Sequence, residues 1–413
     1  MNTTSDTSSG NPDTTALKRS INPWVLMLYG LGTVVGAGIY VVIGKIIGTA
    51  GALAPFAFVL AAMAAALTAL SYAELCTRVA QSGGSAAFVS AGFGSRLLTG
   101  LAGWGIVATG IVSAATIATG FVGYSNVFMS ISKWWAVPLL VGTLTLIAVI
   151  GIRQSSWFMA VTTIAGVAGL VWVVAYGWSE IGNYPAKLEG DLNQGFGSIA
   201  QLVLPASFLA FYAYIGFEDL VTLSEEAEDQ ATAMPRAIWF TLIASLILYL
   251  IVSIVAISVL PADDLSQSAA PLVDVVEAQG ASGFLLGAVS LAMIVNGAIA
   301  QIVMVPRVIH DLGSRRRAAP EWLSKVNRKT GTPIPATIMA GAIVTALALF
   351  FPTERLASWT SYIILAVFTA ANLALVRLKL REDDERPPYK VPLLVPITGA
   401  IVSVGLITGE FLL

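Results

Sequence analysis

Long apolar segments are the feature that most constrains the fold of this chain. Eleven segments of roughly 20 residues are almost free of charged side chains, and about 20 apolar residues are needed to cross a bilayer as a helix. They are too long and too uniformly apolar for strands. We therefore predict an all-α polytopic membrane protein. The predicted spans are Trp24–Ile43, Leu53–Tyr72, Leu97–Phe121, Trp134–Ile152, Phe158–Trp178, Ile199–Phe217, Ala237–Val259, Gly283–Met304, Ile334–Phe351, Leu356–Val376 and Leu393–Leu412.

Composition excludes a soluble enzyme. Of 413 residues, 56% are hydrophobic and 11% are charged, whereas soluble chains carry about 25% charged residues. Cys76 is the only cysteine and His310 the only histidine, so neither an intrachain disulfide nor a Cys/His metal or haem site is expected. We predict no cofactor, no metal site and no catalytic residue.

Basic residues predict the orientation. If the N-terminus is cytoplasmic, only four of the 22 lysines and arginines lie outside, and the remaining 18 lie inside; the four are Lys45, Lys133, Lys187 and Arg355. This bias satisfies the positive-inside rule. We predict a multi-pass protein of a bacterial cytoplasmic (inner) membrane, and eleven spans place the C-terminus outside.

Three polar segments flank or connect the spans. Residues 1–22 are rich in Ser, Thr, Asn and Asp, so we predict a disordered cytoplasmic tail without a cleavable signal peptide. Residues 179–198 form a predicted extracellular loop. The arginines at 315–317 are expected to meet anionic lipid headgroups, and nucleic-acid binding is not expected from so short a run.

Two spans contain glycines at which a helix could unwind. Gly36-Ala37-Gly38 lies in the first span, and Gly216 follows aromatic residues in the sixth and precedes two acids. Close packing against another helix is the alternative explanation for the glycines of the first span. An unwound midplane segment frees main-chain groups and leaves a half-helix N-terminus that suits a carboxylate.

The two candidate breaks occupy corresponding positions in two halves. Residues 23–178 and 199–378 each hold five predicted spans, and each break falls in the first span of its half. An odd number of spans requires that the second half be inverted relative to the first. We predict two inverted five-helix repeats, followed by residues 379–413 as a cytoplasmic loop and an eleventh helix.

Motifs along nearly the whole chain resemble the amino acid, polyamine and organocation transporter superfamily. In chain order they are Gly36–Ile39, Ser71–Leu75, Ser82–Ser85, Phe211–Glu218, Ser224–Glu226, Met234–Arg236, Arg307–Gly313, Gly331–Pro333 and Arg386–Pro392. The resemblance implies a LeuT-type fold and secondary active transport of amino acids or related amines.

The resemblance also implies a substrate site built mainly from the main chain. Amides of Gly36, Ala37, Gly38 and Ile39 would hold the substrate carboxylate. Carbonyl groups around Phe211, Ala213 and Tyr214 would hold its ammonium group, and the side chains that would touch the substrate are Val34, Tyr212 and Ile215. Main-chain dipoles can bind a zwitterion without burying a full charge in the bilayer.

Ionisable and polar residues inside spans are the candidates for coupling or gating. Glu218 follows the second break and matches a proton-sensitive glutamate of acid-resistance antiporters, although packing at a helix end is the alternative. The other candidates are Thr33, Ser290 and Asn296. Gly166 stands where some relatives carry a lysine in helix 5 that replaces a sodium ion, so lysine-based proton coupling is not expected.

Glu74 lies at the cytoplasmic end of the second span. An ion pair with Arg78 at i+4 is expected, with a structural or gating role favoured over coupling.

We expect a secondary transporter that works by alternating access. The apolar pocket candidates favour neutral, hydrophobic L-amino acids. One alternative is a cationic amino acid or polyamine carrier with Glu218 as counter-charge, and another is a channel or a non-transporting membrane subunit. A proton or sodium gradient is a possible driving force, so symport, antiport and oligomeric state stay open.

Overall fold

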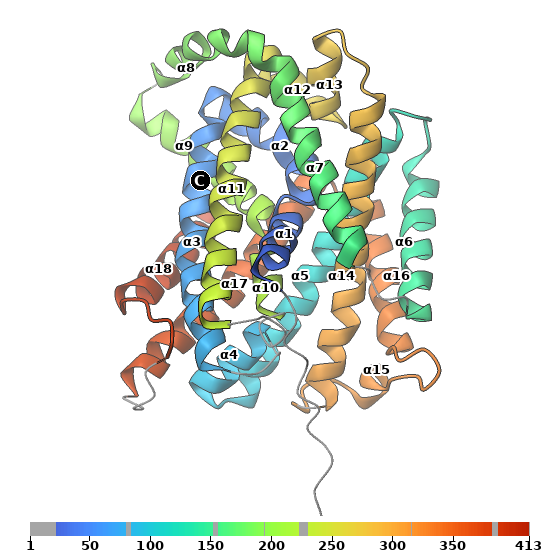
Figure 1. The fold of residues 1–413 in the computed structure, drawn as a ribbon, viewed down its shortest axis with the longest axis vertical. Helices are drawn as coiled ribbons and strands as arrows, with labels where there is room; N and C mark the ends of the chain where they lie inside the picture. The colour runs from blue at the N-terminus through green and yellow to red at the C-terminus, as the bar shows by residue number, and fades with distance from the viewer. Residues whose placement is uncertain are drawn as a thin grey trace, which may run out of the picture.

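The computed structural model describes residues 22–79, 84–151, 156–193, 195–222, 230–314, 316–381 and 387–412. Every regular element within these ranges is helical, and most long helices run along the longest axis of the molecule (Figure 1). The predicted tail lies outside these ranges except for Asn22, whose side chain accepts a hydrogen bond from Trp24 N at the start of the first helix. The acidic segment Glu225–Asp229 and Arg315 also lie outside them.

All eleven predicted apolar segments are helical, and nine of them contain one main helix each. The first is divided between α1 and α2, and the sixth between α9, the 3-10 turn η3 and α10. Their bounds are α1 Pro23–Val34, α2 Ala37–Ala50, α3 Ala54–Arg78, α5 Arg96–Ser125, α6 Lys133–Ile150, α7 Ser156–Gly177, α9 Phe196–Phe211, η3 Tyr212–Tyr214, α10 Phe217–Thr222, α11 Gln230–Val259, α14 Phe284–Ser314, α16 Ile334–Phe350, α17 Thr353–Leu380 and α18 Leu394–Leu412.

Eight helical stretches in the described part of the chain have the length and apolarity needed to cross a membrane. The helices α1, α16 and α18 are apolar as well, but their apolar stretches are shorter than these eight. Helix α1 is short because the first span is interrupted after it and continues as α2. The chain is therefore a multi-pass helical membrane protein, while its orientation and the division into repeats stay predictions.

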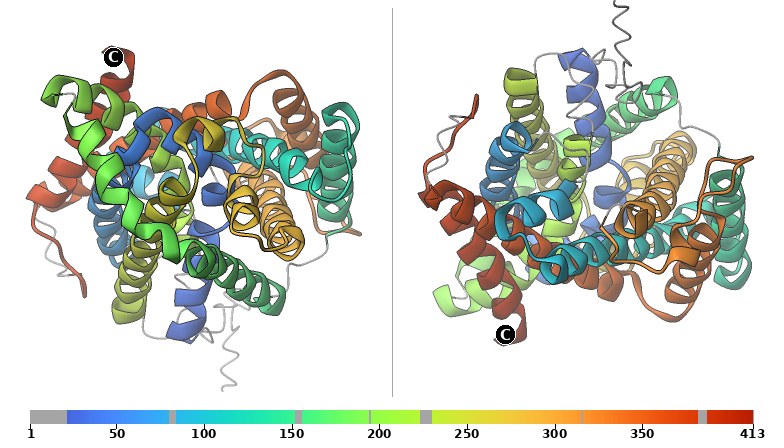
Figure 2. Two further views of the ribbon diagram at one scale, coloured as in Figure 1. Left: turned by 90° about the horizontal axis from the view of Figure 1, so that it is seen from above. Right: turned by 90° about the horizontal axis from the view of Figure 1, so that it is seen from below.

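Short helices that the apolar pattern did not predict cover the two ends of the bundle (Figures 1 and 2). At the lower end in Figure 1 lie α4 and α15, and at the upper end α8, α12 and α13. Their hydrophobic faces are too short for a span-length signal. Their bounds are α4 Gly84–Phe93, η1 Gly51–Leu53, η2 Trp178–Asn183, α8 Tyr184–Leu192, α12 Ala262–Gln267, α13 Pro271–Ala278 and α15 Glu321–Ser324.

The segment expected as a polar extracellular loop is largely helical, and it is tied to the bundle. In α8, Asp191 accepts a hydrogen bond from Ala52 N at 2.8 Å, and Tyr184 donates to Ala52 O at 3.0 Å. Lys187 donates to Ile257 O near the end of α11 at 2.5 Å. These bonds satisfy main-chain groups of η1 and of the last turn of α11, so the segment is fastened to the upper end of the bundle.

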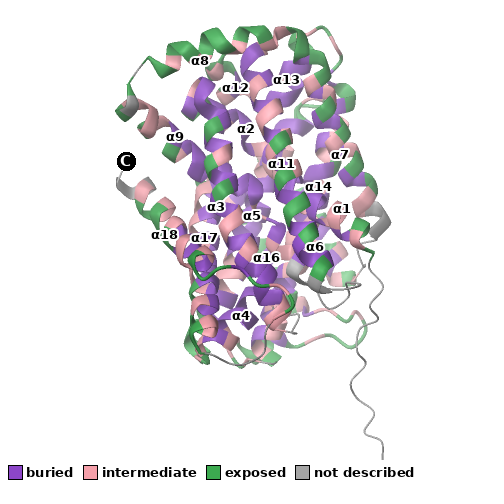
Figure 3. Ribbon diagram, turned by 60° about the vertical axis from the view of Figure 1, so that its left-hand side comes forward, coloured by how far each residue is buried: buried purple, intermediate pink, exposed green. Residues whose placement is uncertain are grey.

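Buried residues lie mostly on the inner sides of the helices and exposed residues on the outer sides (Figure 3), and many of the exposed residues are large and apolar. Helix α3 packs against α9, α11 and α18, and its buried stripe includes Ala57, Ala61 and Ala65. Small side chains allow close approach of membrane helices.

Candidate substrate site at two helix breaks

The first break confirms the prediction made from Gly36-Ala37-Gly38. Helix α1 ends at Val34, and α2 begins at Ala37, with Gly36 at φ −48° and ψ −142° between them. A β-carbon on Gly36 would lie 2.9 Å from Gly32 O, so the main chain leaves no room for a side chain there. The N-cap residue of α2 is Gly36, which has no side chain to cap the helix. Its first N–H groups lack helical acceptors and carry the positive end of the helix dipole.

The second break lies where the sixth span was expected to unwind. Helix α9 ends at Phe211, η3 follows, Ile215 is extended at φ −65° and ψ 135°, and α10 starts at Phe217. Gly216 between them has φ +128°, which favours glycine over residues with a side chain. The break is thus fixed by one residue that needs a positive φ.

Glu218 has a structural role at this second break. Its Oε2 accepts a hydrogen bond from Gly216 N at 2.8 Å, so the carboxyl group caps the first turn of α10. An acidic side chain in the first turn also complements the helix dipole. The expected position just after the break is confirmed, and a part in coupling stays a prediction.

The two breaks lie side by side, as close approaches between their main chains show. A β-carbon on Gly216 would lie 2.7 Å from Thr33 O, and one on Gly38 would lie 3.2 Å from Ala213 Cα. Tyr249 of α11 joins them, because its hydroxyl lies 2.8 Å from Val34 O and 2.9 Å from Ala213 O. The N-terminal end of α2 therefore lies beside η3.

The predicted pocket residues are gathered around these breaks. Tyr212 extends towards α5, where its hydroxyl lies 3.3 Å from Ser113 Oγ, and Tyr214 donates to Phe58 O of α3 at 3.2 Å. Ile215 is half-buried. The others are buried and come from α1, α2 and the end of the sixth span; they are Val34, Ala37, Ile39, Phe211 and Ala213. The structure brings all ten predicted substrate residues together, and their contact with a substrate stays a prediction.

Of the three remaining coupling candidates, two adjoin the first break. Thr33 lies at the contact with Gly216, and its hydroxyl donates to Gly30 O at 2.9 Å. Asn296 of α14 is buried and precedes Gly297, where a β-carbon would lie 3.1 Å from Ala37 Cβ. Thr33 and the Asn296 region therefore adjoin the first break.

Ser290 lies in α14, six positions before Asn296. Its buried hydroxyl donates to Leu286 O at 2.7 Å in its own helix. This bond uses the hydroxyl proton and leaves the lone pairs of the oxygen, so a part in coupling stays a prediction.

At Gly166 of α7 a larger residue would have to displace the side chain of Met293. A β-carbon at this position would lie 2.5 Å from Met293 Sδ of α14, and Gly166 O accepts a hydrogen bond from Tyr40 at 2.6 Å. A methionine therefore packs against the glycine face of α7.

Two partners of the site were missed by sequence reasoning. Ser113 gave no signal, since serine is common in spans. Tyr249 did give one, because it is the only polar side chain within the apolar run 246–252.

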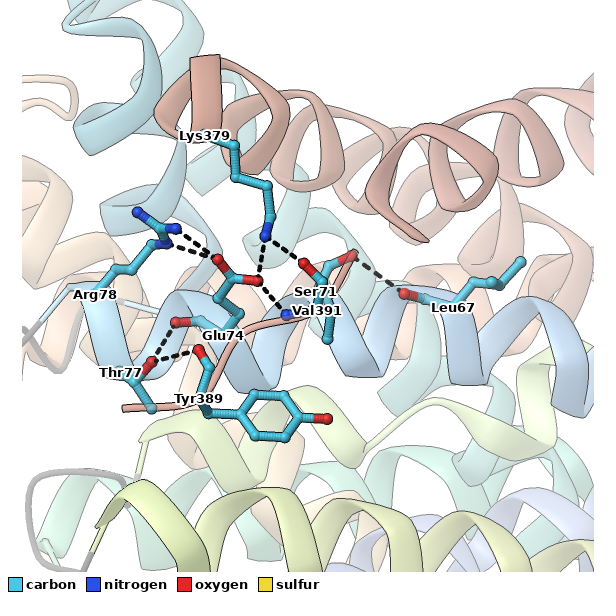
Figure 4. Close-up of polar contacts among 8 residues, drawn as sticks. All are labelled: Leu67, Ser71, Glu74, Thr77, Arg78, Lys379, Tyr389 and Val391. Atoms are coloured by element: carbon cyan, nitrogen blue, oxygen red, sulfur yellow. Dashed lines mark hydrogen bonds and ion pairs between the residues drawn. The ribbon is translucent and has the colours of Figure 1, made fainter. Parts of the chain in front are cut away.

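Glu74 forms a separate buried ion cluster at the end of the bundle that carries α4. Its Oε1 lies 2.7 Å from Arg78 Nη2, which confirms the expected i,i+4 pair. Its Oε2 lies 2.6 Å from Lys379 Nζ and accepts from Val391 N at 2.7 Å (Figure 4). Lys379 also donates to Val391 O at 2.5 Å. The cluster thus fastens α3 to the end of α17 and to the segment before α18.

Comparison with known proteins identifies the family. The family model described as amino acid permease matches residues 21–412. The chain belongs to the amino acid permease family. It is therefore a membrane transporter rather than an enzyme, in agreement with the superfamily resemblance of its motifs.

The permease is similar to several described proteins over most of its length. It is 27% identical to a branched-chain amino acid permease of Bacillus subtilis, over 94% of this chain and 86% of that one. It is also 27% identical to a vacuolar cationic amino acid transporter of Arabidopsis thaliana, over 90% and 65%.

A solved structure confirms the predicted LeuT-type fold. A Na⁺-coupled sialic acid symporter in a substrate-bound outward-open state superposes with a TM-score of 0.64 at 13% identity, over 96% of this chain and 90% of that one.

Proposed function

We propose that this permease carries neutral, hydrophobic L-amino acids across a bacterial cytoplasmic membrane by alternating access, with the substrate held between the two helix breaks. The observation that carries the proposal is that the N-terminus of α2, whose N-cap is Gly36, lies beside η3. N–H groups at a helix N-terminus bind carboxylates, and main-chain carbonyl groups can accept from ammonium with a remaining lone pair. An α-amino acid supplies both groups.

The surroundings of the breaks favour an apolar substrate side chain. Val34, Ala37, Ala213 and Ile215 offer hydrocarbon only, and Tyr212 has its hydroxyl near Ser113. The similarity to the branched-chain permease of Bacillus subtilis supports the same substrate class.

A cationic amino acid or polyamine is the second candidate. It is favoured by the similarity to the vacuolar cationic amino acid transporter of Arabidopsis thaliana. Its counter-charge would be Glu218, whose carboxyl group already accepts a hydrogen bond from Gly216 N. The apolar side chains around the breaks favour the neutral substrate, so we place this substrate class second.

The test is binding and uptake by the purified protein in liposomes with leucine, alanine, lysine and putrescine. We expect leucine to bind and to exchange in counterflow, which needs a carrier cycle and which a channel does not support. Preference for lysine or putrescine would select the second candidate. If none of the four is bound or exchanged, the proposed substrate class and site are wrong.

Coupling is tested in the same liposomes by imposing pH and sodium gradients separately. Uptake driven by pH alone would implicate Glu218, since carboxyl groups in spans serve proton relays. Uptake driven by sodium would implicate the oxygen-bearing candidates Thr33, Ser290 and Asn296. Exchange unaffected by either gradient would make the protein an exchanger.

A further inference from the structure

A groove lies between the starts of α3 and α9, below α8 at the upper end of the bundle (Figure 1). Its volume is about 370 Å³. One wall consists of Leu53, at the end of η1, and of Phe56 and Leu60 in the first two turns of α3. Residues three and four positions apart share a face of a helix, so these side chains line up along the groove. Leu192, the last residue of α8, also lines it.

The opposite wall belongs to α9 and includes Ala200, Val203 and Leu204. Leu53 and Val203 are buried, whereas Phe56 and Leu204 are exposed. The groove therefore has a buried floor and an open side. All of the residues that line it have hydrocarbon side chains.

The open side of the groove faces the hydrocarbon of the membrane. Helices α3 and α9 belong to two of the stretches that can cross a bilayer, Ala37–Arg78 and Gly197–Leu220. Two turns of helix extend over about 10 Å, and half of the hydrocarbon core is about 15 Å thick. The groove thus lies at the depth of the acyl chains in the leaflet on the side of α8. Atoms that line a groove without a filling group lose dispersion contacts, so an acyl segment gains contacts by entering it.

The dimensions of the groove exclude a helix of a partner protein. From Leu53 to Leu60 the chain rises by about 10 Å, so the volume corresponds to a mean cross-section of about 35 Å². A helix with its side chains is at least about 10 Å wide and needs about twice this area. A single acyl chain is thinner than a helix and fits.

Polar side chains beside the upper part of the groove indicate a lipid with a headgroup. Asn193 follows Leu192, and Gln201 follows Ala200; both are exposed. Their amide groups donate hydrogen bonds of the kind that phosphate and ester oxygens accept. A β-carbon on Gly197, one turn before Gln201, would meet no atom of the described residues within 4 Å, which leaves room for a headgroup.

We propose that this groove is a binding site for one phospholipid, with an acyl chain between α3 and α9 and the headgroup beside Asn193 and Gln201. Hydrocarbon below and amide donors above match the order of groups along a phospholipid that stands in this leaflet. The site is separate from the helix breaks, and its occupancy does not depend on which substrate is carried.

Photolabelling of the full-length protein in nanodiscs is the first measurement. The nanodiscs contain phosphatidylethanolamine and phosphatidylglycerol, with a trace of phosphatidylethanolamine that carries a diazirine on one acyl chain. We expect peptides over residues 53–60 and 199–204 to be labelled about threefold more than residues 139–146 of α6, because a pocket surrounds most of a bound ligand. Leu139 and Leu146 are exposed, so this part of α6 reports ordinary contact with lipid. Equal labelling of the groove and α6 would overturn the proposal.

The variant Ala200→Trp fills the groove. We expect it to lower the labelling of residues 53–60 to the level of α6. The matched control is Gly142→Trp, because a β-carbon at position 142 of α6 enters open space, and labelling of the groove should then match the wild type. If Ala200→Trp does not fold, Ala200→Leu is the second variant, and it should lower the labelling about twofold. Labelling that is unchanged by a folded groove variant would overturn the proposal.

Retention of lipid after exchange into detergent tests the headgroup. We expect native mass spectrometry to show one phospholipid on the wild type and on Gly142→Trp, and none on Ala200→Trp. Gln201→Leu should lower the retained fraction about fivefold, the factor that one net hydrogen bond supplies, while its acyl labelling in nanodiscs matches the wild type. Detergent or a free fatty acid on the wild type in place of a phospholipid would overturn the proposal, and so would full retention by Gln201→Leu together with Asn193→Leu.

Discussion

Replacement of Glu74 by glutamine should destabilise the protein strongly although it changes only one group. Glu74 is 0% exposed, and its two cationic partners, Arg78 and Lys379, are 16% and 6% exposed. Glu74→Gln keeps the shape of the side chain and leaves two buried cations without their counter-charge. Uncompensated charges of this kind are among the few causes of large single-residue effects.

The magnitude follows from the contacts of the two oxygens. Removing one partner of a buried ion pair costs about 3–5 kcal/mol. Arg78 retains partial access to water, and the amide oxygen of glutamine can still accept from Val391 N, so we expect about 3 kcal/mol of lost unfolding free energy, at the lower end of that range.

The assay is unfolding of the purified protein in mixed detergent micelles, followed by tryptophan fluorescence. Glu354→Gln is the matched control, because Glu354 forms an ion pair with Lys45 at 3.1 Å. The side chains of Glu354 and Lys45 are 54% and 31% exposed. Exposed pairs contribute about 1 kcal/mol or less. The same chemical change should therefore have a much smaller effect at this position.

A double variant separates charge imbalance from lost packing. Adding Lys379→Met to Glu74→Gln removes one of the two uncompensated cations and should restore part of the lost stability. The reasoning is refuted if Glu74→Gln is as mild as Glu354→Gln, or if the double variant is less stable than the single one.

Two further predictions concern the helix breaks and the topology. Gly216→Ala should abolish leucine uptake in a protein that still folds, because its β-carbon would meet Thr33 O at 2.7 Å in a backbone with φ +128°. Gly38→Leu should abolish uptake as well. The control Gly142→Ala should transport normally, because a β-carbon at position 142 enters open space. Wild-type uptake by both break variants would contradict the assignment of the breaks. Alkaline phosphatase fused after Leu413 should be active in the periplasm and inactive when fused after Arg381; the opposite pattern would reverse the predicted orientation.

Local pattern predicted the helices and both breaks. Apolar length marks a helix that can cross the bilayer, because the main chain must satisfy its own hydrogen bonds there. Gly36 has no space for a β-carbon beside Gly32 O of the preceding turn, and Gly216 has a positive φ; both are conditions of the local main chain, whereas the contact of Gly216 with Thr33 is not. The pair between Glu74 and Arg78 was also predictable, since i and i+4 share one face of a helix.

The rest of the candidate site depends on residues far apart in the chain. Lys379 follows Glu74 by more than 300 positions, and no periodicity relates them. The short helices at the ends of the bundle escaped detection because α8 and α4 are shorter than a span. Tyr249 was visible as a polar residue in an apolar run, but its acceptors were not.

By itself the sequence determined a polytopic helical protein with interruptions in its first and sixth spans, because hydrophobic length and glycine conformation are properties of short segments. Tertiary structure alone decided that these interruptions lie side by side, that Tyr249 bonds to both, and that Glu74 acquires a second cation. The physical reason is that a buried polar group takes whatever partner the packing of helices brings within hydrogen-bond distance, and that partner is set by the arrangement of the bundle rather than by distance along the chain.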